Sequence, residues 1–107
     1  MSLRGRSAFS RVYREGIRRR FGEIVVFIAE DRPGLPQVGF VAGKRVGNAV
    51  RRNRAKRRLR AAASQVSLPR GTAMIVVALP GVNHAAFLDL VGWLEDAARS
   101  GTVPKAG

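Results

Sequence analysis

The chain has no cysteine among its 107 residues and only one histidine. Without thiols, neither a disulfide framework nor a thiolate metal site can form, and nothing argues for an oxidising compartment. No apolar run approaches the roughly 20 residues that span a bilayer, and the N-terminus lacks the apolar segment of a secretory signal. We therefore expect a soluble, cytoplasmic protein. Its length fits a single domain over residues 1–107, with a frayed tail from about residue 101.

The same scarcities argue against a catalytic site made by this chain alone. His84 is the only histidine and no serine stands in a recognisable nucleophile context, so a triad or a zinc site lacks partners. The stretch GKRVGN has two glycines around a lysine but lacks the order and the Ser/Thr of a P-loop. Two acidic pairs, at residues 30–31 and 95–96, are better explained by surface solvation than by metal binding. We therefore predict no catalytic residue, no metal site and no cofactor bound by the protein alone.

Acidic residues are also few, and the positive charge is concentrated in two segments. Seven Asp and Glu stand against 20 Lys and Arg, which gives a net charge of +13. Residues 1–20 carry +6 and residues 44–60 carry +9, whereas the rest of the chain is close to neutral. Such a distribution is typical of a surface that binds a polyanion, and it should also attract sulfate or phosphate. Nucleic acid is the first hypothesis; an anionic membrane surface is the second, and it would need large apolar residues opposite the basic ones on a helix.

Two strands and a first helix are predicted in the N-terminal half. Ser7 is expected to cap a short helix that places Phe9 and Tyr13 on one face and ends at Gly16. Residues 23–29 and 37–43 are β-branched and aromatic runs that flank a Pro-Gly turn signal. We interpret these two runs as an antiparallel pair of strands.

The C-terminal half predicts one more strand and a last helix. Residues 73–79 form a continuous apolar run between Pro and Gly residues, which favours a strand in the centre of the sheet. Asn83 is expected to cap a helix that Gly101 and Pro104 end, with its apolar face made of Phe87, Leu90, Val91, Leu94 and Ala98. The resulting fold class is α+β, a two-layer sandwich of a small mixed sheet and three helices in the order α-β-β-α-β-α.

The densest basic stretch, KRVGNAVRRNRAKRRLR (residues 44–60), is predicted to form the middle helix, with Asn48 as its cap. A narrow apolar stripe repeats at helical spacing through Ala55, Leu59, Ala62 and Val66. Small alanines suit packing on a sheet and are poor for insertion into lipid, which argues against the membrane hypothesis. Basic side chains three and four residues apart repel one another unless an anion lies between them. Asn53, among them, is neutral and can both donate and accept.

This stretch closely resembles the signature of the bacterial ribonuclease P protein component. The family's helix carries an Arg-Asn-Arg core followed by three basic residues, and here these are Arg52, Asn53, Arg54, Lys56, Arg57 and Arg60. Upstream, the family's two aromatics and glycine are matched by Phe9, Tyr13 and Gly16, and VGFVAGKR fits the strand that leads into the helix. The resemblance covers most of the chain.

The resemblance implies the function and the site residues. Proteins of this family bind a large catalytic RNA, and the complex removes the 5′ leader of precursor tRNA, with the RNA and its magnesium ions performing the hydrolysis. The implied contacts with the RNA subunit come from Lys44, Arg45, Arg51, Arg52, Asn53, Arg54, Lys56, Arg57 and Arg60. The implied leader contacts, in a cleft between the first helix and the sheet, come from Phe9, Tyr13 and Phe27.

Two alternatives stay open. The three aromatic residues could instead be core residues, and the protein could be a ribosomal or other structural RNA-binding protein that shares the charge without the cleft. The topology also carries a conflict. If residues 37–43 and 73–79 form parallel strands, the connection should be right-handed on general grounds, whereas the resemblance implies a left-handed βαβ crossover. We expect the left-handed form.

Overall fold

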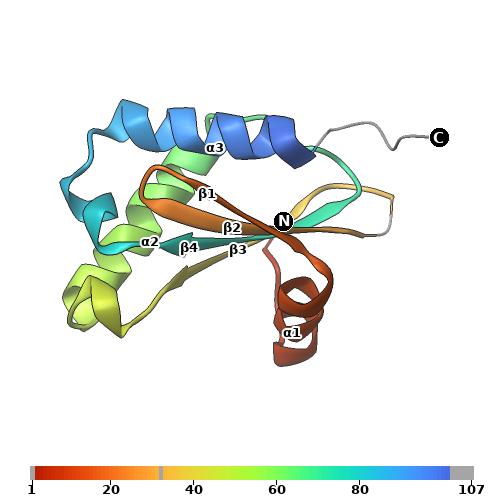
Figure 1. The fold of residues 1–107 in the computed structure, drawn as a ribbon, viewed down its shortest axis with the longest axis horizontal. Coiled ribbons are helices and arrows are strands. Elements are labelled where there is room, and N and C mark those ends of the chain that lie inside the picture. Colours follow the sequence, from red (N-terminus) through yellow and green to blue (C-terminus); the bar gives the residue numbers. More distant parts are fainter. Residues whose placement is uncertain (1, 32, 102–107) are drawn as a thin grey trace.

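The computed structural model describes residues 2–31 and 33–101, which form a four-stranded sheet with helices on both faces (Figure 1). The elements in chain order are α1 (Arg6–Glu15), β1 (Ile17–Phe21), β2 (Ile24–Glu30), β3 (Gln37–Ala42), the short 3-10 helix η1 (Lys44–Val46), α2 (Ala49–Ala63), β4 (Thr72–Ala78), the 3-10 helix η2 (Pro80–His84) and α3 (Phe87–Gly101). Helices α2 and α3 pack on one face and α1 on the other. The predicted α+β class with three α-helices and a mixed sheet is confirmed.

The strands lie in the order β1-β2-β4-β3, so β4 separates β2 from β3. Strand β4 is antiparallel to β2 and parallel to β3. The prediction that residues 23–29 and 37–43 pair with each other is therefore wrong. The reason is that β4, whose residues are almost all buried, gains most from a position with a neighbour on each side. The predicted central position of residues 73–79 is confirmed.

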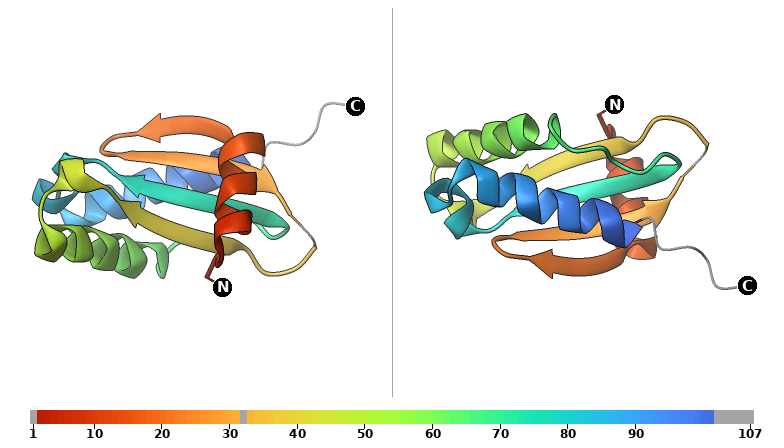
Figure 2. Two further views of the ribbon diagram at one scale, coloured as in Figure 1. Left: turned by 90° about the horizontal axis from the view of Figure 1, so that it is seen from below. Right: turned by 90° about the horizontal axis from the view of Figure 1, so that it is seen from above.

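Helix α2 connects the parallel strands β3 and β4. In the view from the side of α2 and α3, with both strands turned to point upward, β4 lies to the left of β3 (Figure 2). The crossover is left-handed, as the resemblance implied and against the usual preference for right-handed connections.

Strand β1 was not predicted. Its sequence, IRRRF, has three consecutive arginines and offers no apolar alternation, so it lacks the pattern by which a half-buried strand is recognised. It forms because the tight turn at Gly22, in the left-handed region at φ 53°, lets it pair with β2 along its whole length. A Cβ at Gly22 would also overlap the indole of Trp93, which lies against this turn.

The predicted helix ends were partly right. Asn48 caps α2, its Oδ1 accepting a hydrogen bond of 3.0 Å from the backbone N–H of Arg51. Gly16 follows the last residue of α1, as expected. Ser7 does not cap α1, because the helix already starts at Arg6 and its N-cap residue is Gly5, which has no side chain to accept a capping hydrogen bond. Helix α2 ends at Ala63, shortly before Val66.

Asn83 does not cap the last helix, because it lies inside η2 and α3 begins only at Phe87. Its Nδ2 instead donates to the backbone oxygen of Arg51 in α2, at 3.0 Å. Helix α3 extends to Gly101. Pro104 lies outside the described residues.

The core has two parts, one on each face of the sheet. The larger part joins α2 and α3 to the sheet and contains the apolar stripe of α2, in which Ala55, Leu59 and Ala62 are fully buried. The smaller part lies under α1 and contains Val12, Ile75 and neighbouring residues. Across residues 2–31 and 33–101, no helix combines the length and the apolar character needed to cross a membrane.

Candidate nucleic-acid interface

The basic stretch forms one surface along η1 and α2, on the side of α2 that faces away from the sheet. Its exposed members are Lys44, Arg45, Arg51, Asn53, Arg54, Arg57 and Arg60, and its half-buried members are Arg52 and Lys56. The buried stripe of α2 fixes the rotation of the helix, so residues opposite the stripe point outward, whereas residues beside it, such as Arg52 and Lys56, are half-buried. All nine residues that the sequence proposed for RNA contact therefore lie on η1 and α2, and seven of them are exposed.

Arg58 belongs to the same basic run but serves the fold. Its guanidinium is partly buried and donates from Nη1 to the backbone oxygen of Val82 and from Nη2 to that of Ala85, the latter at 2.6 Å. Both carbonyls belong to η2 or its end, so Arg58 ties the middle of α2 to the segment that leads into α3. A planar guanidinium suits two such acceptors because its donors lie in a fixed fork.

Arg60 is also partly engaged, since its guanidinium carbon lies 5.6 Å from the centre of the Phe40 ring on β3. This is a cation–π contact between the guanidinium and the ring. The side chain remains exposed, and its N–H groups can still donate to an anion.

A hollow of about 490 Å³ lies where η1, the first turns of α2 and η2 meet. Three arginines line it, Arg45, Arg51 and Arg54, together with Asn83 and His84. The Oδ1 atom of Asn83 is buried and has no hydrogen-bond partner within the described part of the chain. Sequence reasoning missed Asn83 and His84 as members of the basic surface, because they join it only through the tertiary contact between η2 and α2.

Multivalent anions should stabilise this protein. With a net charge of +13 and three arginines around one hollow, an anion that binds only the folded state raises stability by mass action. We expect sulfate or phosphate to raise the melting temperature by about 4–8 °C per kcal/mol of binding free energy. Thermal scans in sulfate, phosphate and chloride at equal ionic strength test this, and an equal response to all three would mean simple screening.

The aromatic residues of α1 and β2 lie on the other face of the sheet. The rings of Tyr13 and Phe27 meet edge to face, with centroids 4.8 Å apart and planes at 77°. Tyr13 is 40% exposed and Phe27 is half-buried. Burial raises the pKa of the Tyr13 phenol above its ordinary value, so its hydroxyl is protonated at neutral pH and can donate a hydrogen bond.

Phe9, one turn before Tyr13, packs on Gly39 of β3. A Cβ at position 39 would overlap the ring of Phe9, so the close approach of α1 to the sheet requires glycine there. Phe9 and Phe27 both contact the smaller core cluster and both keep part of their surface exposed. The structure therefore brings the three aromatics to one face, where they are part of the packing and accessible at the same time.

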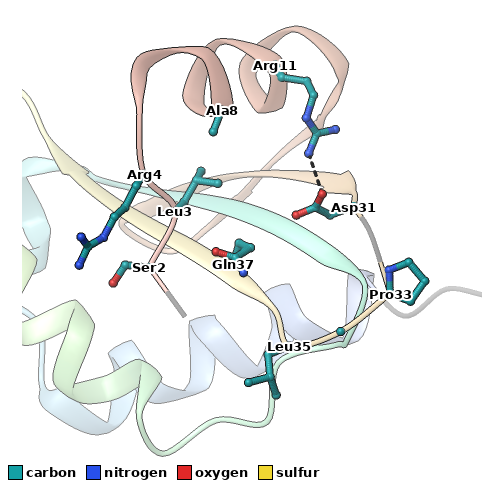
Figure 3. A pocket seen from close by; sticks show the side chains of 10 residues that line it. Ser2, Leu3, Arg4, Ala8, Arg11, Asp31, Pro33, Leu35 and Gln37 are labelled. Carbon is teal, nitrogen blue, oxygen red and sulfur yellow. Dashed lines mark ion pairs between the residues drawn. The ribbon is translucent and has the colours of Figure 1, made fainter.

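A second hollow, of about 810 Å³, lies beside α1 and the loop between β2 and β3 (Figure 3). Arg11 lines it but is already engaged, with Nη2 3.4 Å from Asp31 Oδ1 and Nη1 donating to the backbone oxygen of Glu30 at 3.1 Å. None of the three aromatics lines this hollow. Arg4 also lines it, whereas Asp31 offsets the charge of Arg11.

The acidic residues do not converge. Among residues 2–31 and 33–101, no group of three or more His, Cys, Asp or Glu side chains lies close enough together to hold a metal ion. The chemistry that these residues present is the binding of anions and of flat apolar groups.

Comparison with known proteins identifies the family. The family model for ribonuclease P matches residues 1–100. The chain is 45% identical over 93 residues to the ribonuclease P protein component of Acidothermus cellulolyticus, which covers 82% of this chain and 77% of that relative. It is 36% identical over 110 residues to that of Symbiobacterium thermophilum, covering 98% and 95% of the two chains.

A solved structure agrees on the fold. The ribonuclease P protein of Thermotoga maritima superposes with a TM-score of 0.81 at 21% identity, covering 94% of this chain and 96% of that one. The sequence match decides between the two RNA-binding hypotheses, against a ribosomal protein. The chain belongs to the bacterial ribonuclease P protein family, the RNA-binding component of an endoribonuclease that processes tRNA.

Proposed function

We propose that this protein binds the catalytic RNA of ribonuclease P through the basic surface of η1 and α2, and the 5′ leader of precursor tRNA through Phe9, Tyr13 and Phe27. Hydrolysis of the phosphodiester is assigned to the RNA and its magnesium ions. The protein's own part is to bind and to position.

The arrangement of the two surfaces carries this proposal. The basic helix α2 packs on one face of the sheet, and the aromatics lie on the other face with α1. Two separate RNA segments can therefore contact the protein at once without competing for the same side chains. The two surfaces also differ in chemistry, since guanidinium groups suit the phosphates of a folded RNA and exposed rings suit unpaired bases.

The leader assignment predicts a selective defect. In the double variant Phe9→Leu, Tyr13→Leu, precursor tRNA with a leader of several nucleotides should bind the holoenzyme at least several-fold more weakly, because the loss of each base stack costs about 1–3 kcal/mol. Mature tRNA, which has no leader, should bind as before. The measurement is the ratio of precursor to mature tRNA affinity in variant and wild-type holoenzymes.

Leucine keeps most of the apolar bulk over Gly39, which limits the loss of packing under α1. A matched control is Phe87→Leu, an aromatic change on the α2 and α3 side of the sheet, which should leave the ratio unchanged. Circular dichroism checks folding. An unchanged ratio in a folded double variant would remove both aromatics from the leader site, and a variant that fails to fold would show that they serve the core.

A further inference from the structure

Strand β1 is an edge strand whose arginines divide between the two faces of the sheet. Its register with β2 sets Arg18 opposite Phe27 and Arg19 opposite Val26. Opposite residues in an antiparallel pair point to the same face. Phe27 contacts the cluster under α1 and Val26 is buried in the cluster under α2 and α3. Arg18 therefore lies on the aromatic face, and Arg19 lies on the other.

The side chain of Arg18 is exposed and uncommitted. Within the described residues it forms no hydrogen bond or ion pair. Arg20 shares its face but is directed to the hairpin turn, where Nε donates to the backbone oxygen of Gly22 at 2.9 Å and Nη2 lies 3.9 Å from Glu23 Oε1. Arg18 is thus the β1 arginine whose charge is free on this face.

The aromatic face beside Arg18 is not covered by a helix. Helix α1 crosses one end of the sheet, and no other described helix lies over this face (Figure 2). Residues directly opposite in an antiparallel pair have Cβ atoms about 5 Å apart. The stem of Arg18 therefore starts beside Phe27, whose ring contacts Tyr13.

A free guanidinium next to exposed rings suits single-stranded nucleic acid, because cations bind the phosphates while aromatic rings stack on the bases. We propose that Arg18 binds a phosphate of the precursor tRNA leader and extends the leader surface from α1 onto β1. This inference rests on the proposed function of the three aromatics. It adds a contact to the backbone of the leader that does not depend on the base sequence.

A simpler role for these arginines is to protect an edge strand from pairing with another chain, as charged side chains often do. In that role the face would not matter, and Arg18 and Arg19 would be equivalent. The two residues are adjacent, equally charged, both exposed and both on β1. They therefore form a matched pair that differs in the face of the sheet.

The test compares Arg18→Gln with Arg19→Gln in the holoenzyme, using precursor tRNA with a leader of about ten nucleotides and mature tRNA. Arg18→Gln should lower precursor affinity about threefold to tenfold at low salt and leave mature tRNA affinity unchanged. The slope of log affinity against log salt should fall by about 0.7 for the precursor, as for one phosphate of a single strand. Arg19→Gln should change neither. Arg18→Lys, which keeps the charge, should keep the slope.

Equal effects of Arg18→Gln and Arg19→Gln, or no effect of Arg18→Gln, would overturn the inference. A lower slope of log affinity against log salt in Arg18→Lys would also contradict the inference. The Lys variant keeps the charge of an exposed edge position, so it still tests the inference if Arg18→Gln folds poorly. The Phe9→Leu, Tyr13→Leu variant is measured alongside. If the aromatic variant lowers the precursor ratio and Arg18→Gln does not, this inference fails alone; if neither does, the leader assignment fails.

Discussion

Replacing Arg58 by alanine should lower the free energy of unfolding by about 2–4 kcal/mol, an estimate that follows from losing two hydrogen bonds to a charged donor in a partly buried site. The guanidinium bridges the carbonyls of Val82 and Ala85. Its removal leaves the Ala85 carbonyl without this donor and leaves the Val82 carbonyl with the 3.4 Å bond from the backbone N–H of Ala85. Urea denaturation followed by circular dichroism measures the change. The dependence of the unfolding free energy on urea concentration checks that the variant and the wild type unfold alike.

The neighbouring residue provides the control. Arg57 has the same side chain and is exposed, with no hydrogen bond or ion pair in the described residues. Arg57→Ala should therefore shift stability by no more than about 0.5 kcal/mol, as is usual for surface positions. Arg58→Lys should recover only part of the loss, because a single ammonium lacks the fork that spans two carbonyls. Equal stability of the Arg57 and Arg58 alanine variants would show that the bridge contributes nothing.

Removing charge from the exposed side of α2 should weaken RNA binding and leave the free energy of unfolding nearly unchanged, in contrast to Arg58→Ala. We expect the double variant Arg54→Ala, Arg57→Ala to bind the catalytic RNA at least tenfold more weakly. The slope of log affinity against log salt should fall by about 0.7–0.9 for each phosphate that the variant no longer neutralises. Filter binding or fluorescence titration over a salt series gives both quantities. A slope equal to that of the wild type would mean that these arginines do not contact phosphates.

Asn53 directly precedes Arg54 in the sequence and lies on the same exposed surface. Asn53→Ala should weaken binding while leaving the salt slope nearly unchanged, because a neutral amide releases no counterion. This separates a polar contact from a phosphate contact on one helix. A fall in slope as large as that of a single arginine variant would refute the assignment.

The helix that carries the basic surface could be predicted closely because its signals are local. Asn48 caps the helix through an interaction that spans three residues, and the alanine and leucine stripe repeats within a few turns. Such short-range patterns decide which side of a helix is buried, and therefore which side presents charge. The locally encoded features of the first helix, its aromatics and its end at Gly16, were predicted for the same reason.

The pairing of strands could not be predicted in the same way. The turn signal near Pro33 indicates that the chain reverses, but it does not say whether another strand enters between β2 and β3. Strand β1 carries no apolar pattern and exists because β2 offers it a paired edge. In the sequence its arginines counted only as part of the basic segment of residues 1–20, and nothing there indicated that they divide between the two faces of a sheet.

The sequence alone determined that this protein is basic, that its densest charge lies on one helix with an alanine stripe, and that two of its aromatics, Phe9 and Tyr13, stand at helical spacing. Only the tertiary structure decided which of the basic residues are free to bind. Arg57 and Arg58 are adjacent on α2, yet the carbonyls that engage Arg58 belong to a segment more than 20 residues later in the chain. The physical reason is that charge is a property of the residue, whereas its availability depends on acceptors that folding brings from elsewhere.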